Sequence, residues 1–193
     1  MERDQICQKG RNFIESDNYL FSRYTIDDKD CHWKLCGEVY DDVLLSNDEF
    51  MRKSWEDVLL DTNRLQLKII YKITQEYIGE VSLRNLDSDR PEIGIQLLRK
   101  YHNQGIGTQV MQLFIARLKE VVQINCFSVR IFSNNYISQR LFEKIGAVQV
   151  GTEGKEYSEL MAKIMNEMGR DKFEQVIQND FENTQHFIIC YEI

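Results

Sequence analysis

The chain alternates between short apolar runs and polar segments, and the spacing of the apolar positions changes along it. Residues 65–73, 77–83 and 92–98 are rich in Ile, Val, Leu and Tyr, and short polar links separate them. Runs of this length and composition are typical of β-strands. We therefore predict an antiparallel meander of three strands in the middle of the chain, and an opening strand at residues 19–25.

Helical spacing is found between the opening strand and the meander. Ser46 followed by Glu49 has the pattern of a capping box. The apolar residues after it form one helical face: Phe50, Met51, Trp55, Val58 and Leu59. The earlier polar segment with Trp33, Leu35 and Val39 is compatible with another helix. The first half of the chain is therefore expected to place helices between its strands.

The second half has the order strand, helix, strand, helix. Residues 107–122 carry an apolar stripe at helical spacing, residues 127–132 have strand character, and residues 135–145 return to helical spacing. Asn134 or Asn135 is suited to cap this last helix, and a glycine follows its final turn. Strands joined by a crossover helix are parallel. The sheet should therefore mix antiparallel and parallel pairs.

A glycine-rich turn, residues 101–108, connects the meander to the long helix. Gly105 and Gly107 allow the backbone to approach a ligand without interference from a Cβ atom. The first turn of the helix then offers unpaired N–H groups and the positive end of its dipole to a phosphate. The turn predicts a site for a phosphorylated cofactor, with a tight turn that binds no ligand as the alternative.

Two familiar phosphate loops require residues that this turn lacks. A P-loop needs Lys followed by Ser or Thr, and no such pair follows either glycine. A dinucleotide-binding loop needs a third glycine where Val110 stands. A nucleotide-binding domain is therefore a hypothesis that rests on the glycines alone.

Two motifs together resemble the GNAT superfamily of acyl-CoA-dependent N-acyltransferases over residues 77–151. The family's pyrophosphate loop, Arg/Gln-x-x-Gly-x-Gly/Ala, matches residues 102–107, with His102 in place of Arg or Gln. Its second signature, Asn-x-x-Ala/Ser-x-x-Leu-Tyr/Phe-x-Lys-x-Gly-Phe, matches residues 135–147. The Asn and Ser of this variant are most similar to the branch with the ribosomal-protein N-terminal acetyltransferases.

The resemblance implies an α/β (α+β) fold. The expected core is a mixed sheet of six to seven strands flanked by helices, in a single domain over residues 1–193. Residues 155–186 are longer than the usual link before the family's last strand, and their periodicity predicts one or two amphipathic helices. Their Met-rich stripe fits either a core, or a flap over the acceptor site or a dimer surface. Residues 187–193 have strand character and would be the last strand.

The resemblance also implies which residues bind acetyl-CoA. The backbone at Leu97 and Leu98 is expected to pair with pantetheine as a neighbouring strand would, and the Leu98 N–H is the candidate donor to the oxyanion. The other expected contacts come from the loop and the second signature: Asn103, Gln104, Gly105, Ile106, Gly107, Thr108, Asn135, Ser138, Phe142 and Lys144.

Chemistry in this class is direct attack of a neutral amine on the thioester, so the protein must orient two substrates, accept a proton and polarise a carbonyl. Glu92, which begins its strand, is expected to accept the proton, and Glu80 is the alternative. No covalent enzyme intermediate is required.

Phe142 stands where many members of the family have a tyrosine that protonates the departing CoA thiolate. Ser138 and Tyr136 are therefore expected to assist departure, with Tyr101 as a further candidate. Phe142 and His102 also motivate a second hypothesis, a catalytically silent acyl-CoA-binding or regulatory module.

Composition is that of a soluble globular protein, with 193 residues, 28% charged and 42% hydrophobic. The sequence has neither a signal-peptide core nor an apolar run long enough for a membrane span, which predicts a cytoplasmic protein without a membrane partner. The net charge of −7 and the lack of a Lys and Arg cluster argue against nucleic-acid binding and slightly favour a cationic partner such as an amine.

Cysteine usage gives little sign of disulfides or metal. The five cysteines are scattered, so reduced thiols are expected. Cys31, His32 and Cys36 match no common zinc spacing, and no metal is expected. The expected partners are acetyl-CoA and an amine acceptor, bound by a monomer or homodimer.

Overall fold

The computed structural model describes residues 6, 12–39, 45–122, 124, 126–153 and 188–193. The described elements follow in this order: β1 (Asn12–Glu15), β2 (Tyr19–Arg23), η1 (Ile26–Asp28), α2 (Lys29–Val39), α4 (Asp48–Leu60), β3 (Arg64–Tyr71), β4 (Glu76–Arg84), β5 (Glu92–Leu97), η2 (Arg99–Tyr101), α5 (Ile106–Val121), β6 (Ser128–Phe132), α6 (Tyr136–Lys144), β7 (Val148–Glu153) and β8 (Ile188–Glu192).

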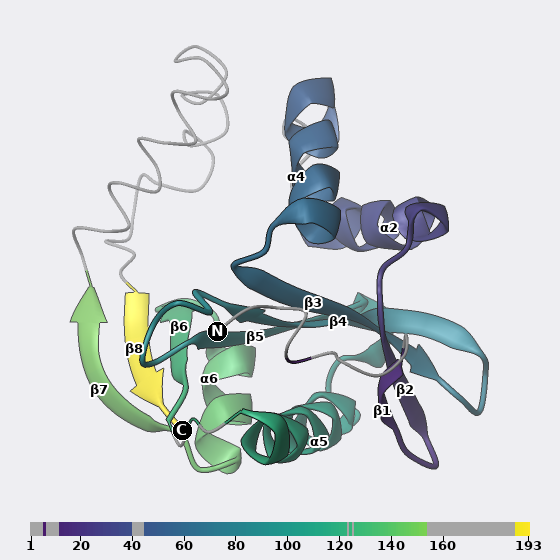
Figure 1. The fold of residues 1–193 in the computed structure, drawn as a ribbon. Coiled ribbons are helices and arrows are strands. Elements are labelled where there is room, and N and C mark those ends of the chain that lie inside the picture. The colour runs from purple at the N-terminus through teal and green to yellow at the C-terminus, as the bar shows by residue number, and fades with distance from the viewer. Residues whose placement is uncertain (1–5, 7–11, 40–44, 123, 125, 154–187) are drawn as a thin grey trace.

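The described strands form one mixed sheet with the order β1-β2-β3-β4-β5-β6-β8-β7. The predicted meander is confirmed as β3, β4 and β5, which pair antiparallel. The pair β5–β6 is parallel, as the crossover helix α5 requires. Helices α2 and α4 lie over one face of the sheet, and α5 and α6 lie over the other (Figure 1).

The α/β fold with a central mixed sheet is confirmed, but the described sheet has eight strands rather than six to seven. The additional strand β1 has only four residues, Asn-Phe-Ile-Glu, which is too short to show an alternating pattern. The strand expected at residues 187–193 is confirmed as β8, which lies between β6 and β7. The helical insertion predicted at residues 155–186 lies outside the described residues.

The starts of two helices are set by asparagine side chains. Asn135 Oδ1 accepts from the Ser138 N–H at 3.1 Å, so the predicted cap of the second signature is Asn135. The capping box predicted at Ser46 is wrong, because the N-cap of α4 is Asn47, whose Oδ1 accepts from the Phe50 N–H at 3.0 Å. Asn and Ser are comparably good N-caps, so the sequence pattern did not separate adjacent positions.

The two faces of the sheet differ in chemistry because successive side chains of a strand point to opposite faces. On the side of α5, a Cβ atom on Gly107 would lie 3.6 Å from Leu97 Cδ1 and 3.9 Å from Ile95 Cδ1, so this face is apolar. The face toward α2 and α4 carries buried polar side chains: Ser22, Gln66, Lys68, Glu80 and Ser82. We call this second surface the polar face. Buried polar groups need partners, so it must hold either an internal network or a ligand.

Candidate active site

The strands β5 and β6 separate immediately after they meet. Their ladder contains one pair, Glu92 with Ser128, and the Ser128 N–H also donates to the Pro91 carbonyl at 3.0 Å. Beyond this point the edge of β5 faces a gap rather than a neighbouring strand. The two parallel strands therefore diverge next to the strand end at which pantetheine is expected to pair.

Two connected clefts occupy this gap. The larger, which we call the loop cleft, has a volume of about 420 Å³ and lies against the glycine turn and α6. The smaller, which we call the strand notch, has a volume of about 200 Å³ and runs between β5 and β6 to the polar face. Both are lined by Ile95, Gln96, Asn135 and Ser138, so the clefts meet at the start of α6.

Most of the predicted cofactor-binding residues line these clefts. Those in the loop cleft are Leu97, Asn103, Gly105, Gly107, Thr108, Asn135, Ser138 and Lys144. Phe142 is buried and lines the strand notch. The arrangement brings the two sequence motifs together around one space, although they lie on different helices. The contact of each residue with a ligand stays a prediction.

Gln104 and Ile106 do not line either cleft. The Gln104 side chain is exposed and donates to the Lys100 carbonyl at 2.5 Å, and the Ile106 side chain is buried in the core. The predicted contacts of these two residues therefore rest on their backbone groups, which lie at the start of α5, where N–H groups lack partners within the helix.

The prediction that Leu98 supplies the oxyanion donor is wrong. Its N–H donates to the Ile78 carbonyl at 2.9 Å, so it belongs to the pairing with β4. Backbone groups of alternate residues point to the same edge of a strand. The N–H groups of Ile95 and Leu97 therefore point the other way, toward the gap with β6. Sequence reasoning found the correct strand end but not this alternation.

The backbone of the glycine turn is shaped by two left-handed residues, Asn103 with φ 58° and Gly105 with φ 75°. A Cβ atom on Gly105 would meet no atom within 4 Å, so the glycine is required by conformation rather than by space. His102, which replaces the usual Arg or Gln, places Nε2 2.8 Å from the Leu97 carbonyl oxygen. Its ring fastens the turn to the end of β5.

Two cations of α6 face the same cleft. Arg140 and Lys144 are four residues apart, which places them on one side of the helix, and both line the loop cleft. Lys144 was predicted from the second signature, whereas Arg140 was missed because the signature leaves its position open. Together with the start of α5 they make the loop cleft suited to a multiply charged anion such as a diphosphate.

The candidate proton donors are unequal in position. Ser138 lines both clefts at the first turn of α6. Tyr136 is 66% exposed and lines neither described cleft, so the structure does not support its predicted role. Tyr101 lines the loop cleft, but its hydroxyl donates to Glu76 Oε2 at 2.6 Å. Ser138 is therefore the best-placed hydroxyl.

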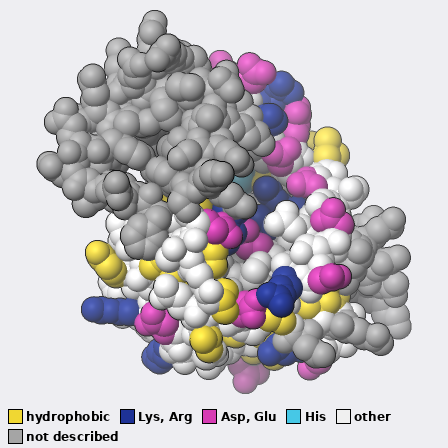
Figure 2. Space-filling view, turned by 90° about the vertical axis from the view of Figure 1, so that its left-hand side faces the viewer, with side chains coloured by type: hydrophobic (Ala, Val, Ile, Leu, Met, Phe, Trp, Pro, Cys, Tyr) yellow, Lys and Arg dark blue, Asp and Glu magenta, His cyan; other side chains and the backbone are white. Residues whose placement is uncertain are grey.

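Glu92 lies in the strand notch between two arginines. Its carboxylate is 3.8 Å from Arg84 Nη1 and 3.9 Å from Arg130 Nη1. Both separations are too long for direct hydrogen bonds, so the carboxylate is attracted by the cations without being fully engaged by them. Arg130 also bonds Glu153 at 3.0 Å. On this side of the molecule, acidic and basic side chains are interspersed (Figure 2).

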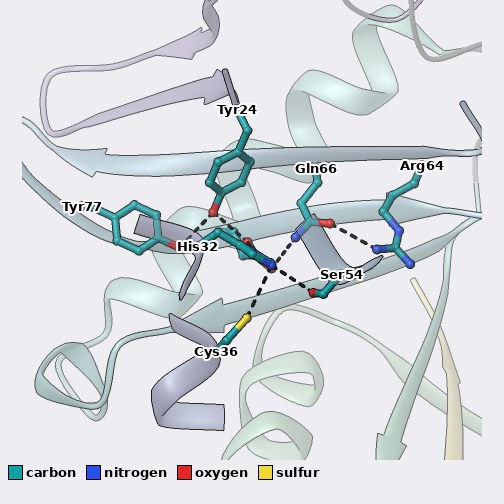
Figure 3. A network of polar contacts seen from close by, with 8 residues as sticks. Tyr24, His32, Cys36, Ser54, Arg64, Gln66 and Tyr77 are labelled. Atoms are coloured by element: carbon teal, nitrogen blue, oxygen red, sulfur yellow. Dashed lines mark hydrogen bonds and ion pairs between the residues drawn. The ribbon is translucent and has the colours of Figure 1, made fainter. Parts of the chain in front are cut away.

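The second predicted base, Glu80, is the centre of a buried network on the polar face. Its carboxylate accepts from the Tyr24 hydroxyl at 2.7 Å and from Gln66 Nε2 at 2.6 Å. His32 Nδ1 lies 3.8 Å away, and the Tyr77 hydroxyl is 2.9 Å from that of Tyr24. Figure 3 shows these side chains converging from α2, β3, β4 and Tyr24, the residue that follows β2. The network joins α2 to the sheet.

Charge in this network is balanced between His32 and Glu80. Burial alone would lower the pKa of His32, but its contacts with the Cys36 sulfur and the Glu80 carboxylate raise that pKa to about 9. Burial alone would raise the pKa of Glu80, but His32, Gln66 and Tyr24 together lower it. His32 is therefore cationic and Glu80 anionic at neutral pH, and both are buried.

The sequence matches the family model described as Acetyltransferase (GNAT) domain over residues 11–148. The chain belongs to the GNAT acetyltransferase family. It is therefore an N-acetyltransferase by family, and GNAT acetyltransferases use acetyl-CoA. No curated protein matches the sequence. None of the described helices has the length and apolar character that a membrane span requires.

Three solved structures illustrate the shared fold. A RimL ribosomal L7/L12 α-N-protein acetyltransferase is 14% identical with a TM-score of 0.66, and the match covers 94% of this chain and 93% of that one. The Microcin C7 self-immunity acetyltransferase MccE, solved with acetyl-CoA and AMP, is 15% identical with a TM-score of 0.64 and coverage of 92% and 93%. The spermidine/spermine N-acetyltransferase SpeG from Vibrio cholerae is 12% identical with a TM-score of 0.64 and coverage of 91% and 92%.

Proposed function

We propose that the protein transfers an acetyl group from acetyl-CoA to a primary amine by direct attack within a ternary complex. The observation that carries this proposal is the separation of β5 from β6, which opens the strand notch between the loop cleft and the polar face. An acyl donor held in the loop cleft would present its thioester in the notch, where an amine could approach from the polar face. The two reactants would then meet in a fixed orientation, which lowers the barrier.

Different groups around the clefts are suited to different parts of acetyl-CoA. The N–H groups of the glycine turn, with Arg140 and Lys144, are suited to the diphosphate of CoA. The Leu97 N–H, which points to the gap, is suited to pantetheine, which would pair with β5 as a strand would, while His102 holds the Leu97 carbonyl. The N–H of Ile95, two residues earlier on the same edge, is suited to polarise the thioester carbonyl.

Glu92 is the proposed acceptor of the proton from the amine, which would reach its carboxylate through bridging water because Glu92 lies three residues before Ile95 on β5. Glu80 is less suited, because its carboxylate already accepts two hydrogen bonds and neutralises a buried cationic His32. Ser138 is the proposed donor to the departing thiolate, and the start of α6 adds the positive end of a helix dipole. We assign this activity to a single domain of residues 1–193 acting in the cytoplasm, as a monomer or homodimer.

The acceptor is not set by the fold. The similar structures include enzymes named for a ribosomal protein and for spermidine or spermine. A primary amine on a small molecule or at a protein N-terminus fits the proposal equally. The second candidate, a silent acyl-CoA-binding module, is favoured by Phe142 alone, which lines the notch but has no proton to donate. Release of free thiol from acetyl-CoA with any amine in a screen would eliminate it.

Calorimetry with acetyl-CoA tests the proposed cradle through a matched pair of variants. Asn and Asp both tolerate the left-handed backbone at Gly105, and they differ in charge rather than shape. Gly105→Asn is expected to bind acetyl-CoA within a fewfold of the unmodified protein. Gly105→Asp should bind at least about tenfold more weakly, because a carboxylate would face the diphosphate. Equal binding by the two variants, or no binding by the unmodified protein, would contradict the proposal.

Ser138→Ala tests the proposed proton donor. We expect kcat to fall by about 10²-fold near neutral pH, since general-acid assistance contributes at least that much, while the affinity for acetyl-CoA changes little. The defect should shrink above about pH 8.5, where a thiolate needs no proton to leave. Tyr136→Phe removes an exposed hydroxyl outside both clefts and serves as the control. A defect in Tyr136→Phe equal to that in Ser138→Ala would reverse this assignment.

A further inference from the structure

Two arginines stand directly opposite each other on the polar face. Arg64 on β3 pairs with Arg84 on β4, and Arg84 pairs in turn with Glu92 on β5. Residues paired across strands point their side chains to the same face of a sheet, and like charges in that position repel each other. The three paired positions therefore place two arginines and one carboxylate in a row across β3, β4 and β5, on one face of the sheet.

Two N–H donors of these arginines have no hydrogen-bond acceptor among the described residues. Among the described residues, the Nε atoms of Arg64 and Arg84 are buried and have no hydrogen-bond partner. Glu92 lies 3.8 Å from Arg84 Nη1, and Asp61 lies 3.8 Å from Arg64 Nε. Arg64 Nη1 reaches Gln66 Oε1 at 3.4 Å, a long contact that Figure 3 shows at the edge of the Glu80 network. Buried donors are rarely left without a partner, so a ligand or an ordered water is expected to complete these two.

Two of these residues, Arg84 and Glu92, border the space where the acceptor would bind. Arg84, Glu92 and Arg130 all line the strand notch. The other carboxylate of the notch, Glu80, is neutralised by the buried His32, and Arg130 is held between Glu92 and Glu153. Arg84, whose side chain is 43% exposed and whose Glu92 contact is longer than a hydrogen bond, is the cation best placed to receive a further anion.

We propose that the amine acceptor carries an anionic group, a carboxylate or a phosphate, that Arg84 binds at the mouth of the strand notch. This inference rests on the proposed acetyl transfer and names the class of acceptor. The planar guanidinium group binds either anion through paired N–H groups. An anion bound by Arg84 would also offset the positive charge that Arg64 adds on the neighbouring strand.

The distance along β5 between Glu92 and Ile95 predicts how far the amine lies from the anion in the acceptor. Glu92, which is level with Arg84, lies three residues before Ile95, whose N–H is assigned to the thioester carbonyl. At about 3.3 Å per residue this corresponds to about 10 Å along the strand. The amine and the anion should therefore be several bonds apart. An α-amino acid, with both groups on one carbon, fits poorly, whereas an acidic side chain near a peptide N-terminus fits.

Two tripeptide amides test the charge preference. Ala-Ala-Asp amide and Ala-Ala-Asn amide have the same length and shape and differ in charge. Acetylation kinetics should give a kcat/KM about tenfold or more higher for the Asp peptide, mainly through KM. Arg84→Gln should abolish this preference, while Arg90→Gln, which removes an exposed arginine paired with Glu192 outside the notch, should keep it. A third peptide with phosphoserine at the last position distinguishes phosphate from carboxylate.

Equal rates with the Asp and Asn peptides, or a preference that survives Arg84→Gln, would overturn the proposal. So would an Arg84-dependent preference for succinyl-CoA over acetyl-CoA, because the anion would then belong to the acyl donor. If no peptide reacts, the melting temperature is measured in saturating CoA, with and without inorganic phosphate. Phosphate should raise the melting temperature of the unmodified protein but not that of Arg84→Gln. Equal shifts in the two proteins would overturn the proposal. Calorimetry with acetyl-CoA distinguishes these results from failure of the proposed function. If the proposed function fails, acetyl-CoA does not bind, whereas failure of the anion proposal alone leaves acetyl-CoA binding intact.

Discussion

Replacing Gly79 with alanine is expected to lower the free energy of unfolding by more than about 4 kcal/mol, which is among the largest effects of single substitutions. Gly79 has φ 146°, a conformation that residues with a Cβ atom rarely adopt. A Cβ atom there would lie 2.1 Å from the Gln96 carbonyl oxygen and 2.8 Å from Leu97 Cα. Both obstacles are backbone atoms, so no side-chain rotation relieves the clash. Urea unfolding followed by circular dichroism measures the loss.

Gly151→Ala is the matched control for this experiment. Gly151 also lies in a strand next to a register shift, but a Cβ atom there would meet nothing within 4 Å. Its replacement should change the free energy of unfolding by less than about 1 kcal/mol. A Gly79→Ala protein as stable as Gly151→Ala would show that β4 and β5 are not in close contact at this position. Because Leu97 also lines the loop cleft, any folded Gly79→Ala protein should bind acetyl-CoA more weakly.

His32→Leu is expected to destabilise the protein by about 3–5 kcal/mol at pH 6, because it leaves the buried Glu80 carboxylate without its cation. The effect depends on pH with a defined sign. The pKa of His32 is raised to about 9 in the folded protein, from the 6.5 of an unperturbed histidine. Its charge therefore stabilises the fold fully below about pH 6.5, and this contribution is lost as the pH rises through about 9. Urea unfolding at pH 6 and pH 10 measures both values.

The double variant His32→Leu with Glu80→Leu is the control for His32→Leu. It removes both charges, so it should be more stable than His32→Leu alone at pH 6. The gap between the unmodified protein and His32→Leu should narrow at pH 10, where the histidine of the unmodified protein is neutral. A gap of the same size at both pH values would mean that packing, rather than charge, makes His32 important.

The elements of the fold were predictable where the apolar pattern was long. The meander, α5 and the strand–helix–strand crossover all follow from runs that keep one periodicity over many residues. Two features were not predictable, each for a different reason. The strand β1 is too short for a pattern, and the place of β8 between β6 and β7 depends on which edge is open rather than on local sequence.

The site was predictable at the level of motifs but not of individual atoms. The glycine turn and the second signature lie around one cleft, as expected from their chemistry. The alternation of backbone groups along β5 was not visible in the sequence, so the donor was assigned to Leu98, whose N–H is taken up by the Ile78 carbonyl. The network around Glu80 was also hidden, because its members, among them Tyr24, His32 and Gln66, are far apart in sequence and carry no shared pattern.

The insertion of β8 between β6 and β7 has a consequence for biosynthesis. A ribosome makes residues 148–153 well before residues 188–192, so for an interval the nascent β7 lacks the strand with which it later pairs. The edge of β6 is uncovered during the same interval. Unpaired strand edges favour association with other chains, and late, distant pairings slow folding. We expect this half of the sheet to be the region where newly made chains depend most on chaperones.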